Sequence, residues 1–182
     1  MVALICILLL SGCSSGNREV ERGIALRDRI LAAEQCSFDV NITADYGDKL
    51  HLFSVSCVGN ADGSLTFTVT EPETIAGITG ELSDDGGKLT FEDNALHFDP
   101  MAEGLISPVS SPWVFFNTLR SGYIVAGGTD GDLLRLTIND SYQEDAFPLD
   151  IWLDSENNPV KAEILYENRR IIGMDVINFH MK

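Results

Sequence analysis

The segment that decides the fold runs from residue 36 to residue 57 and is CSFDVNITADYGDKLHLFSVSC. Apolar and polar residues alternate in both halves of this segment, which is the pattern of a β-strand with one buried face. Asp45-Tyr46-Gly47-Asp48 separates the two halves and has the composition of a turn. The segment is therefore predicted to form an antiparallel hairpin.

The register of this hairpin follows from matching its two apolar faces. Folding about Tyr46-Gly47 pairs residues whose numbers sum to 93, so that Phe38 meets Val55. The same register places Cys36 opposite Cys57. A disulfide between these cysteines is predicted for an oxidising compartment, and the alternative is two reduced cysteines packed in the core.

The alternation continues to the C-terminus in short stretches. Turns rich in glycine, asparagine and acidic residues separate them, at residues 60–63, 84–87, 92–94, 129–132, 154–159 and 167–169. Short strands at regular spacing are typical of a meandering antiparallel sheet. We therefore expect a mainly β (α+β) domain with about ten to eleven strands.

Two helical segments interrupt the β pattern. Glu19 to Gln35 carries an imperfect apolar stripe with interleaved arginines, which predicts an N-terminal helix. Pro100 to Gly122 contains Ser-Pro turns and then the aromatic run from Trp113 to Leu119, which predicts a short helix. This second helix is either an ordinary core element or a lid over an apolar cavity.

The N-terminus has the pattern of an export signal. Val2 to Leu10 is an unbroken apolar run, shorter than the about 20 residues that a membrane-spanning helix needs. It ends in Leu10-Ser11-Gly12-Cys13, which resembles a bacterial lipobox. We expect residues 1–12 to be a signal peptide, Cys13 to carry lipid (palmitate among its acyl groups), and residues 13–18 to be a tether.

This export reading places the domain at the cell membrane, lipid-anchored and facing the extracytoplasmic side. The segment departs from a signal peptide in one respect. A signal peptide normally has Lys or Arg before its apolar core, but here the core begins at Val2, directly after Met1. The alternative for the apolar run is a buried strand or the start of a helix. In either case residues 19–182 form a single domain of ordinary size.

The charge of the chain excludes two classes of partner. The chain has 12 basic and 28 acidic residues, for a net charge of −16. Such a field repels the phosphates of nucleic acids and anionic lipid headgroups. Nucleic-acid binding is therefore not expected.

The sequence contains no pattern typical of catalysis or of a bound cofactor. His51, His97 and His180 are far apart, and none belongs to a Cys/His cluster with the spacing of a zinc site. No glycine-rich phosphate loop is present, and no serine nucleophile lies in a strand-to-helix turn. We expect no enzyme activity, no metal and no cofactor.

Three stretches resemble the Lol-type lipoprotein carrier superfamily. They are residues 67–78, residues 104–108 with the aromatic helix that follows, and residues 148–164 with the final strand. The chain is similar to this superfamily over Glu19 to Lys182 and is nearest to its sporulation and germination lipoproteins. The resemblance implies a strongly curved antiparallel half-barrel whose concave side is plugged by helices.

The resemblance also implies two hypotheses for function. In the first, the concave face binds a lipid or another hydrophobic ligand; its lining would be Phe53, Val55, Phe67, Val69, Phe91, Trp113, Phe115, Phe116 and Leu119. In the second, the helices fill the cavity and the protein is an adaptor that holds a cell-envelope protein. Carriers of this family hold their lid with a basic residue on an early strand, but only Lys49 and Lys88 lie between Cys36 and Leu119.

Overall fold

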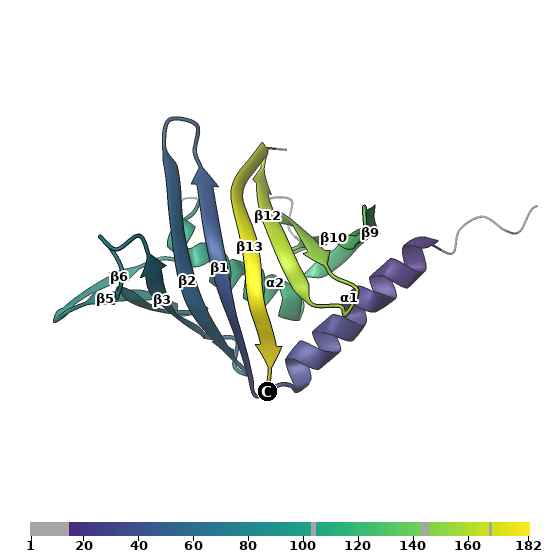
Figure 1. Ribbon diagram of the computed structural model, residues 1–182, viewed down its shortest axis with the longest axis horizontal. Coiled ribbons are helices and arrows are strands. Elements are labelled where there is room, and N and C mark those ends of the chain that lie inside the picture. Colours follow the sequence, from purple (N-terminus) through teal and green to yellow (C-terminus); the bar gives the residue numbers. More distant parts are fainter. Residues whose placement is uncertain (1–14, 103–104, 143–145, 168) are drawn as a thin grey trace, which may run out of the picture.

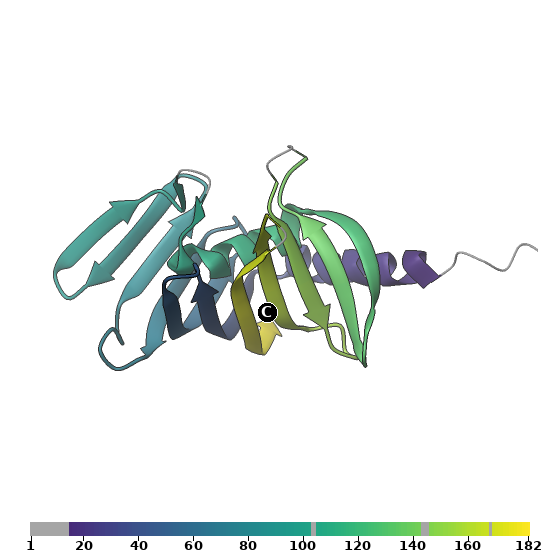
Figure 2. The same ribbon diagram turned by 90° about the horizontal axis from the view of Figure 1, so that it is seen from above.

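A computed structural model describes residues 15–102, 105–142, 146–167 and 169–182. Eleven strands form one antiparallel sheet in the order β6-β5-β4-β3-β2-β1-β13-β12-β11-β10-β9. The sheet curves strongly and stays open between its end strands β6 and β9 (Figures 1 and 2). The predicted half-barrel with about ten to eleven strands is confirmed.

The elements follow the chain in the order that the alternation predicts. They are α1 (Ser15–Ala32), β1 (Gln35–Asp45), β2 (Leu50–Asn60), β3 (Leu65–Glu71), β4 (Thr79–Ser83), β5 (Gly86–Phe91), β6 (Asn94–Phe98), β7 (Met101–Ala102), β8 (Leu105–Ile106), a 3-10 turn (Pro108–Ser110), α2 (Ser111–Ser121), β9 (Tyr123–Asp130), β10 (Leu133–Asn139), β11 (Pro148–Leu153), β12 (Pro159–Tyr166) and β13 (Arg169–Met181). Strands β7 and β8 pair only with each other. The final strand β13 returns to the middle of the sheet and pairs with both β1 and β12.

The register predicted for the first hairpin is wrong by two residues. In the structure Phe38 lies opposite Cys57, and Cys36 lies opposite Gly59. The turn is centred one residue later, because Gly47 has φ +94° and the Tyr46 N–H donates to the Lys49 carbonyl at 3.0 Å. A shift of two residues keeps every side chain on its face, which is why the apolar pattern alone did not detect it.

The predicted disulfide is absent because of this shift. Cys36 and Cys57 lie on a diagonal between β1 and β2, and both are free and buried. They pack as apolar side chains in the core, which is the alternative that the sequence left open.

Helix α1 begins at Ser15 and therefore takes in most of the stretch expected to be a tether. Its buried side is the line Gly23, Leu26 and Ile30, at helical spacing. A Cβ atom at Gly23 would lie 2.7 Å from Leu136, so glycine lets this helix approach β10 closely. In Figure 1, α1 runs diagonally beside β9 and β10. The helix ends at Ala32, and the residues predicted as its last turn lead into β1.

Helix α2 occupies the concave side of the sheet. It begins with Pro112 in its first turn, where a missing N–H costs nothing. Figure 2 shows it lying across the inner side, between the β3–β6 end and the β9–β11 end. Of its eleven residues, eight are buried: Ser111, Pro112, Trp113, Val114, Phe115, Phe116, Thr118 and Leu119. The predicted mid-chain helix is confirmed and starts two residues before Trp113.

Candidate functional site

The concave face is the candidate site, because the inward side chains of the sheet converge there on α2. Alternation along the strands directs the buried residues of β1, β2 and β3 to this face. Phe115 of α2 contacts Phe38 of β1 edge to face, with ring centroids 5.6 Å apart. Phe38 also stacks on Phe179 of β13 at 5.5 Å. These contacts join α2 to the central strands of the sheet.

Phe116 shows how closely the helix fits the sheet. Its side chain is 1% exposed and lies directly on the backbone of β2 at Gly59. A Cβ atom at Gly59 would stand 2.5 Å from the ring, a distance that real Cβ contacts do not reach. Glycine is therefore required here by close approach. No space is left between α2 and β2 at this point.

Two arginines hold α2 in this position. Arg27 of α1 donates to the carbonyls of Leu119 and Gly122 at the end of α2, at 3.0 and 2.5 Å. A cation is favourable at this end of a helix, where carbonyls lack helical partners. Arg120 donates to the Ala61 carbonyl in the β2–β3 turn at 2.6 Å. Burial lowers the pKa of the Arg27 guanidinium.

The other end of α2 is also hydrogen-bonded to the sheet. The Trp113 indole N–H donates to the Gly63 carbonyl of the same β2–β3 turn at 3.2 Å. Before the helix, the Tyr46 hydroxyl of the first hairpin donates to the Ile106 carbonyl at 2.7 Å. Helix α2 is thus hydrogen-bonded to the β2–β3 turn at both of its ends, and to α1 at its C-terminal end.

The sequence did not single out these two arginines. The resemblance places a basic residue on an early strand, between Cys36 and Leu119. Arg27 precedes that interval and Arg120 follows it. No sequence signal points to Ala61 as the partner of Arg120, because a basic residue in the last turn is expected to meet the carbonyls of its own helix.

The structure brings most of the predicted lining residues together, but not all of them. Phe53 lies half-buried at the margin of the core. Seven of the predicted lining residues are buried in one hydrophobic cluster: Val55, Phe67, Val69, Trp113, Phe115, Phe116 and Leu119. Phe91 lies apart at the end of β5 and is 46% exposed. The buried residues belong to the hydrophobic core that also includes the apolar side of α2.

The inner side of the sheet beyond α2 is less covered. We call β4 to β6 (residues 79–98) the wing, which extends away from α2 in Figure 2. Leu89 lies opposite Leu96 on its inner face, and Leu96 is 62% exposed. Phe91 lies two residues along from Leu89 and therefore on the same face. The wing thus presents exposed apolar side chains on the concave side.

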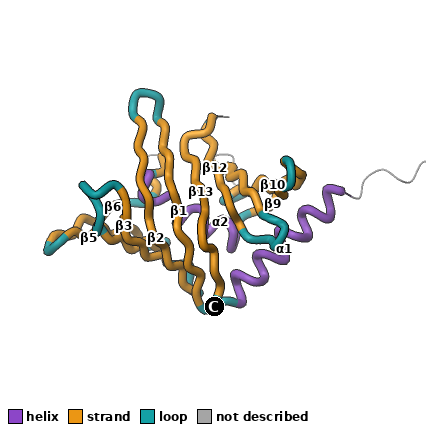
Figure 3. Tube along the Cα trace, viewed as in Figure 1, coloured by secondary structure: helices purple, strands orange, loops and turns teal. Residues whose placement is uncertain are grey.

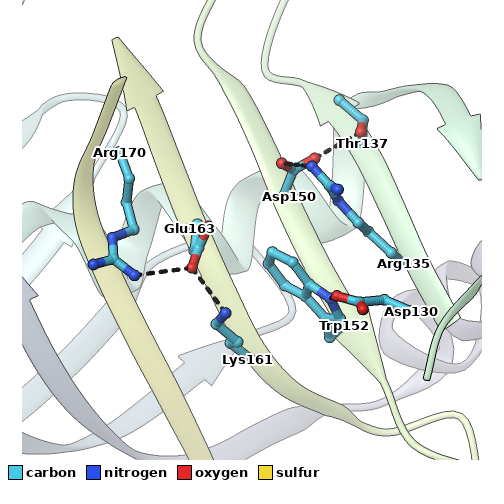
Figure 4. Close-up of polar contacts among 8 residues, drawn as sticks. All are labelled: Asp130, Arg135, Thr137, Asp150, Trp152, Lys161, Glu163 and Arg170. Atoms are coloured by element: carbon cyan, nitrogen blue, oxygen red, sulfur yellow. Dashed lines mark hydrogen bonds and ion pairs between the residues drawn. The ribbon is translucent and has the colours of Figure 1, made fainter. Parts of the chain in front are cut away.

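The outer face carries a polar network that sequence reasoning missed (Figure 4). The buried carboxylate of Asp150 accepts from Arg135 at 2.5 Å and from Thr137 at 2.6 Å. Its hydrogen bond raises the pKa of Arg135. Trp152 lies between Arg135 and Lys161, whose charged groups are 5.3 and 4.2 Å from its ring. The pair of Arg135 and Asp150 joins β10 to β11, and the contact of Lys161 with Trp152 joins β11 to β12. The network therefore ties these three strands together.

Several predictions fall outside what the structure describes. The signal peptide at residues 1–12 and the lipidated Cys13 lie outside the described residues. Among the helices that are described, none combines the length and the apolar character of a membrane span. Within the same residues, no three His, Cys, Asp or Glu side chains gather as a metal site would require.

Comparison with known proteins places the fold. No family model matches the sequence. No curated protein matches it. A domain from Vibrio parahaemolyticus assigned to outer-membrane lipoprotein sorting is similar in structure, with TM-score 0.50 and 6% identity over 91% of this chain and 93% of that one. At this identity the likeness establishes a shared Lol-type fold and no function.

Two further solved structures are similar over most of their length. A LolA superfamily protein from Nitrosomonas europaea gives TM-score 0.48 and 6% identity over 88% of this chain and 93% of that one. The Mycobacterium tuberculosis lipoprotein LppX gives TM-score 0.44 and 13% identity over 89% of this chain and 93% of that one.

Proposed function

We propose that this chain is a non-enzymatic adaptor lipoprotein of the bacterial envelope, which binds a protein partner on its outer surface. The observation that carries the proposal is the burial of α2 in the half-barrel, because it favours the second of the two hypotheses that the sequence left open. Phe115 and Phe116 occupy the concave face of the sheet, where an acyl chain would otherwise bind.

Opening the cavity would require displacing α2. Each large apolar side chain returned to water costs about 1.5–3 kcal/mol, and α2 buries Trp113, Phe115, Phe116 and Leu119. The hydrogen bonds from Arg27 and Arg120 to backbone carbonyls would be lost as well. A ligand would therefore have to replace α2 rather than enter beside it, which favours a permanently filled half-barrel.

Envelope attachment rests on the lipobox-like segment that ends at Cys13. In this proposal the lipid on Cys13 inserts in the outer leaflet of the cytoplasmic membrane, and α1 starts at Ser15, close to the lipid. One acyl chain gives only reversible membrane binding, so a lipidated cysteine needs more than one chain for stable anchoring.

Native mass spectrometry of the full chain purified in detergent, combined with organic extraction, tests the proposal. The expected spectrum shows lipid bound covalently at Cys13 and no non-covalent acyl species in the domain. Binding of a fluorescent fatty acid that displaces α2 would contradict it. Displacement is detected as faster amide exchange in residues 111–121.

The exposed wing favours a second candidate function. Phe91 and Leu96 offer an apolar surface on the concave side without displacement of α2. A hydrophobic ligand bound there gains about 0.8 kcal/mol for each buried CH₂ group. If a fluorescent fatty acid binds, Phe91→Asp is expected to abolish binding, whereas Leu31→Asp on the exposed side of α1 leaves it unchanged.

A further inference from the structure

Strand β2 is longer than the strand that pairs with it on one side. It pairs with β1 along its whole length from Leu50 to Asn60, but with β3 only from Ser54 to Gly59. No described segment forms a ladder with the free side of Leu50–Phe53. In Figures 1 and 3 the upper part of this hairpin projects beyond β3. The result is a short open edge within an otherwise paired region of the sheet.

A groove lies beside this open edge, lined by side chains from both faces of the sheet. It encloses about 610 Å³ and is lined by Asn41, Ile42, Thr43, Leu52, Phe53, Ser54, Thr70, Glu71, Pro72, Glu73 and Ala76. β3 ends at Glu71, and the chain then turns away at Pro72, which leaves the groove open. Leu52 is 61% exposed along it, a high value for leucine. The groove therefore combines free backbone groups with an exposed apolar side chain.

The groove has a fixed shape before any ligand binds, because hydrogen bonds hold the tip of the projecting hairpin in place. Arg169 of β13 donates to Asp45 at 3.1 Å, and Tyr46 is hydrogen-bonded to the segment before α2. An edge that is already in β conformation loses little freedom when a strand is added. The charge at the groove comes from Glu71 and Glu73, in a chain whose net charge is −16.

From this combination we propose that an extended segment of a partner protein adds as a strand along Leu50–Phe53. The segment carries alternating apolar and basic residues, since one face of it would cover Leu52 and its basic side chains would meet Glu71 and Glu73. Strand addition draws affinity from backbone hydrogen bonds and specificity from alternate side chains. The inference deepens the adaptor function and rests on it.

A second copy of this chain fits the edge poorly. Pairing of two identical edges would bring the Glu71 and Glu73 pairs of both copies to the same interface. Like charges that face each other across a strand pair are destabilising. Charge complementarity thus favours a basic partner. A dimer that light scattering detects in the protein, and that Leu52→Asp abolishes, would overturn this choice.

The test uses the full chain in detergent and a fluorescent nine-residue peptide of alternating leucine and lysine. We expect saturable binding in fluorescence anisotropy that weakens by about tenfold or more for Leu52→Asp. Leu31→Asp is the matched control, because Leu31 is also more than half exposed, at 51%, but lies on α1. Equal weakening by both variants would overturn the proposal.

Two further measurements separate strand addition from non-specific attraction. Methylation of alternate peptide nitrogens removes ladder donors and is expected to abolish binding. The double variant Glu71→Lys and Glu73→Lys is expected to prefer a leucine–glutamate peptide over the leucine–lysine peptide. Strand addition at the groove would be contradicted if the methylated peptide bound equally well, or if the double variant still preferred the leucine–lysine peptide.

Failure of the groove and failure of the adaptor function give different results. A non-covalent acyl species in the native mass spectrum that also speeds amide exchange in residues 111–121, with peptide selectivity intact, contradicts only the filled half-barrel. A protein that carries no non-covalent lipid and does not distinguish the two peptides contradicts only strand addition at the groove.

Discussion

At the scale of single residues, Gly59 has the greatest influence on the candidate site. Any side chain there would meet the ring of Phe116, which is held in place by the rest of α2. The position of the helix therefore depends on the absence of one methyl group in β2. The sequence places Gly59 next to a turn, and nothing in that context indicates that a ring fifty-seven residues later lies on it.

Replacement of Gly59 by alanine tests this contact. Overpacking of a filled core typically costs about 1–3 kcal/mol, so we expect Gly59→Ala to lower the free energy of unfolding by that amount. Gly128→Ala is the control, because no atom lies within 4 Å of the Cβ position at Gly128. Denaturant unfolding measures both variants, and equal effects would contradict the close fit of Phe116.

The two core cysteines make a second residue-scale prediction. Burial raises the pKa of both Cys36 and Cys57, and for Cys36 the nearby Arg120 partly opposes this effect. The thiolate is the reactive form, so both are expected to resist iodoacetamide at pH 8 in the folded protein and to react in urea. Peptide mass spectrometry reports each site. A disulfide found between the two in non-reduced protein would contradict the structure.

At the scale of elements, the alternation of the strands was sufficient to predict the succession of strands along the chain and their buried faces. It did not predict that β13 pairs with β1. It could not fix the first hairpin register, because registers two residues apart bury the same faces. The turn decided between them through Gly47 and the Tyr46–Lys49 hydrogen bond. Helix α1 began earlier than predicted, since small polar residues such as Ser15 are common both in linkers and in first helical turns.

The sequence predicted the aromatic helix but not how it is held. Both roles that the sequence left open for α2 involve the same apolar residues, and only their burial distinguishes them. The hydrogen bonds of Arg27 and Arg120 go to backbone carbonyls, which have no signature in a sequence. The same limitation hid the Asp150 network, whose members come from neighbouring strands.

The attachment of α2 through Arg27 can be tested directly. Arg27→Ala removes two charged donors from the end of the helix, and each such bond contributes about 1.5–3 kcal/mol. We expect faster amide exchange in residues 115–122 with little change in β1 or β13. Arg29→Ala is the control, because Arg29 makes only long, exposed hydrogen bonds at 3.4 and 3.5 Å. Similar exchange in both variants would show that Arg27 does not hold α2.

At the scale of the whole molecule, net charge opposes compactness. A charge of −16 on a domain of this size produces self-repulsion that salt screens. The temperature of unfolding is therefore expected to rise when NaCl increases from about 20 mM to about 200 mM, over which the Debye length shrinks. Differential scanning calorimetry measures it. A midpoint that falls with salt would mean that attractive ion pairs outweigh the repulsion.

The pairing of β13 with β1 has a consequence for how the protein is made. Residues 46–168 separate these two central strands, so the middle of the sheet forms only after nearly the whole domain has been synthesised. Contacts of such long sequence separation form slowly. A nascent chain therefore cannot complete this sheet while its C-terminal part is still on the ribosome. Such a delay is compatible with the export that we propose, in which the chain crosses a translocation channel before it folds.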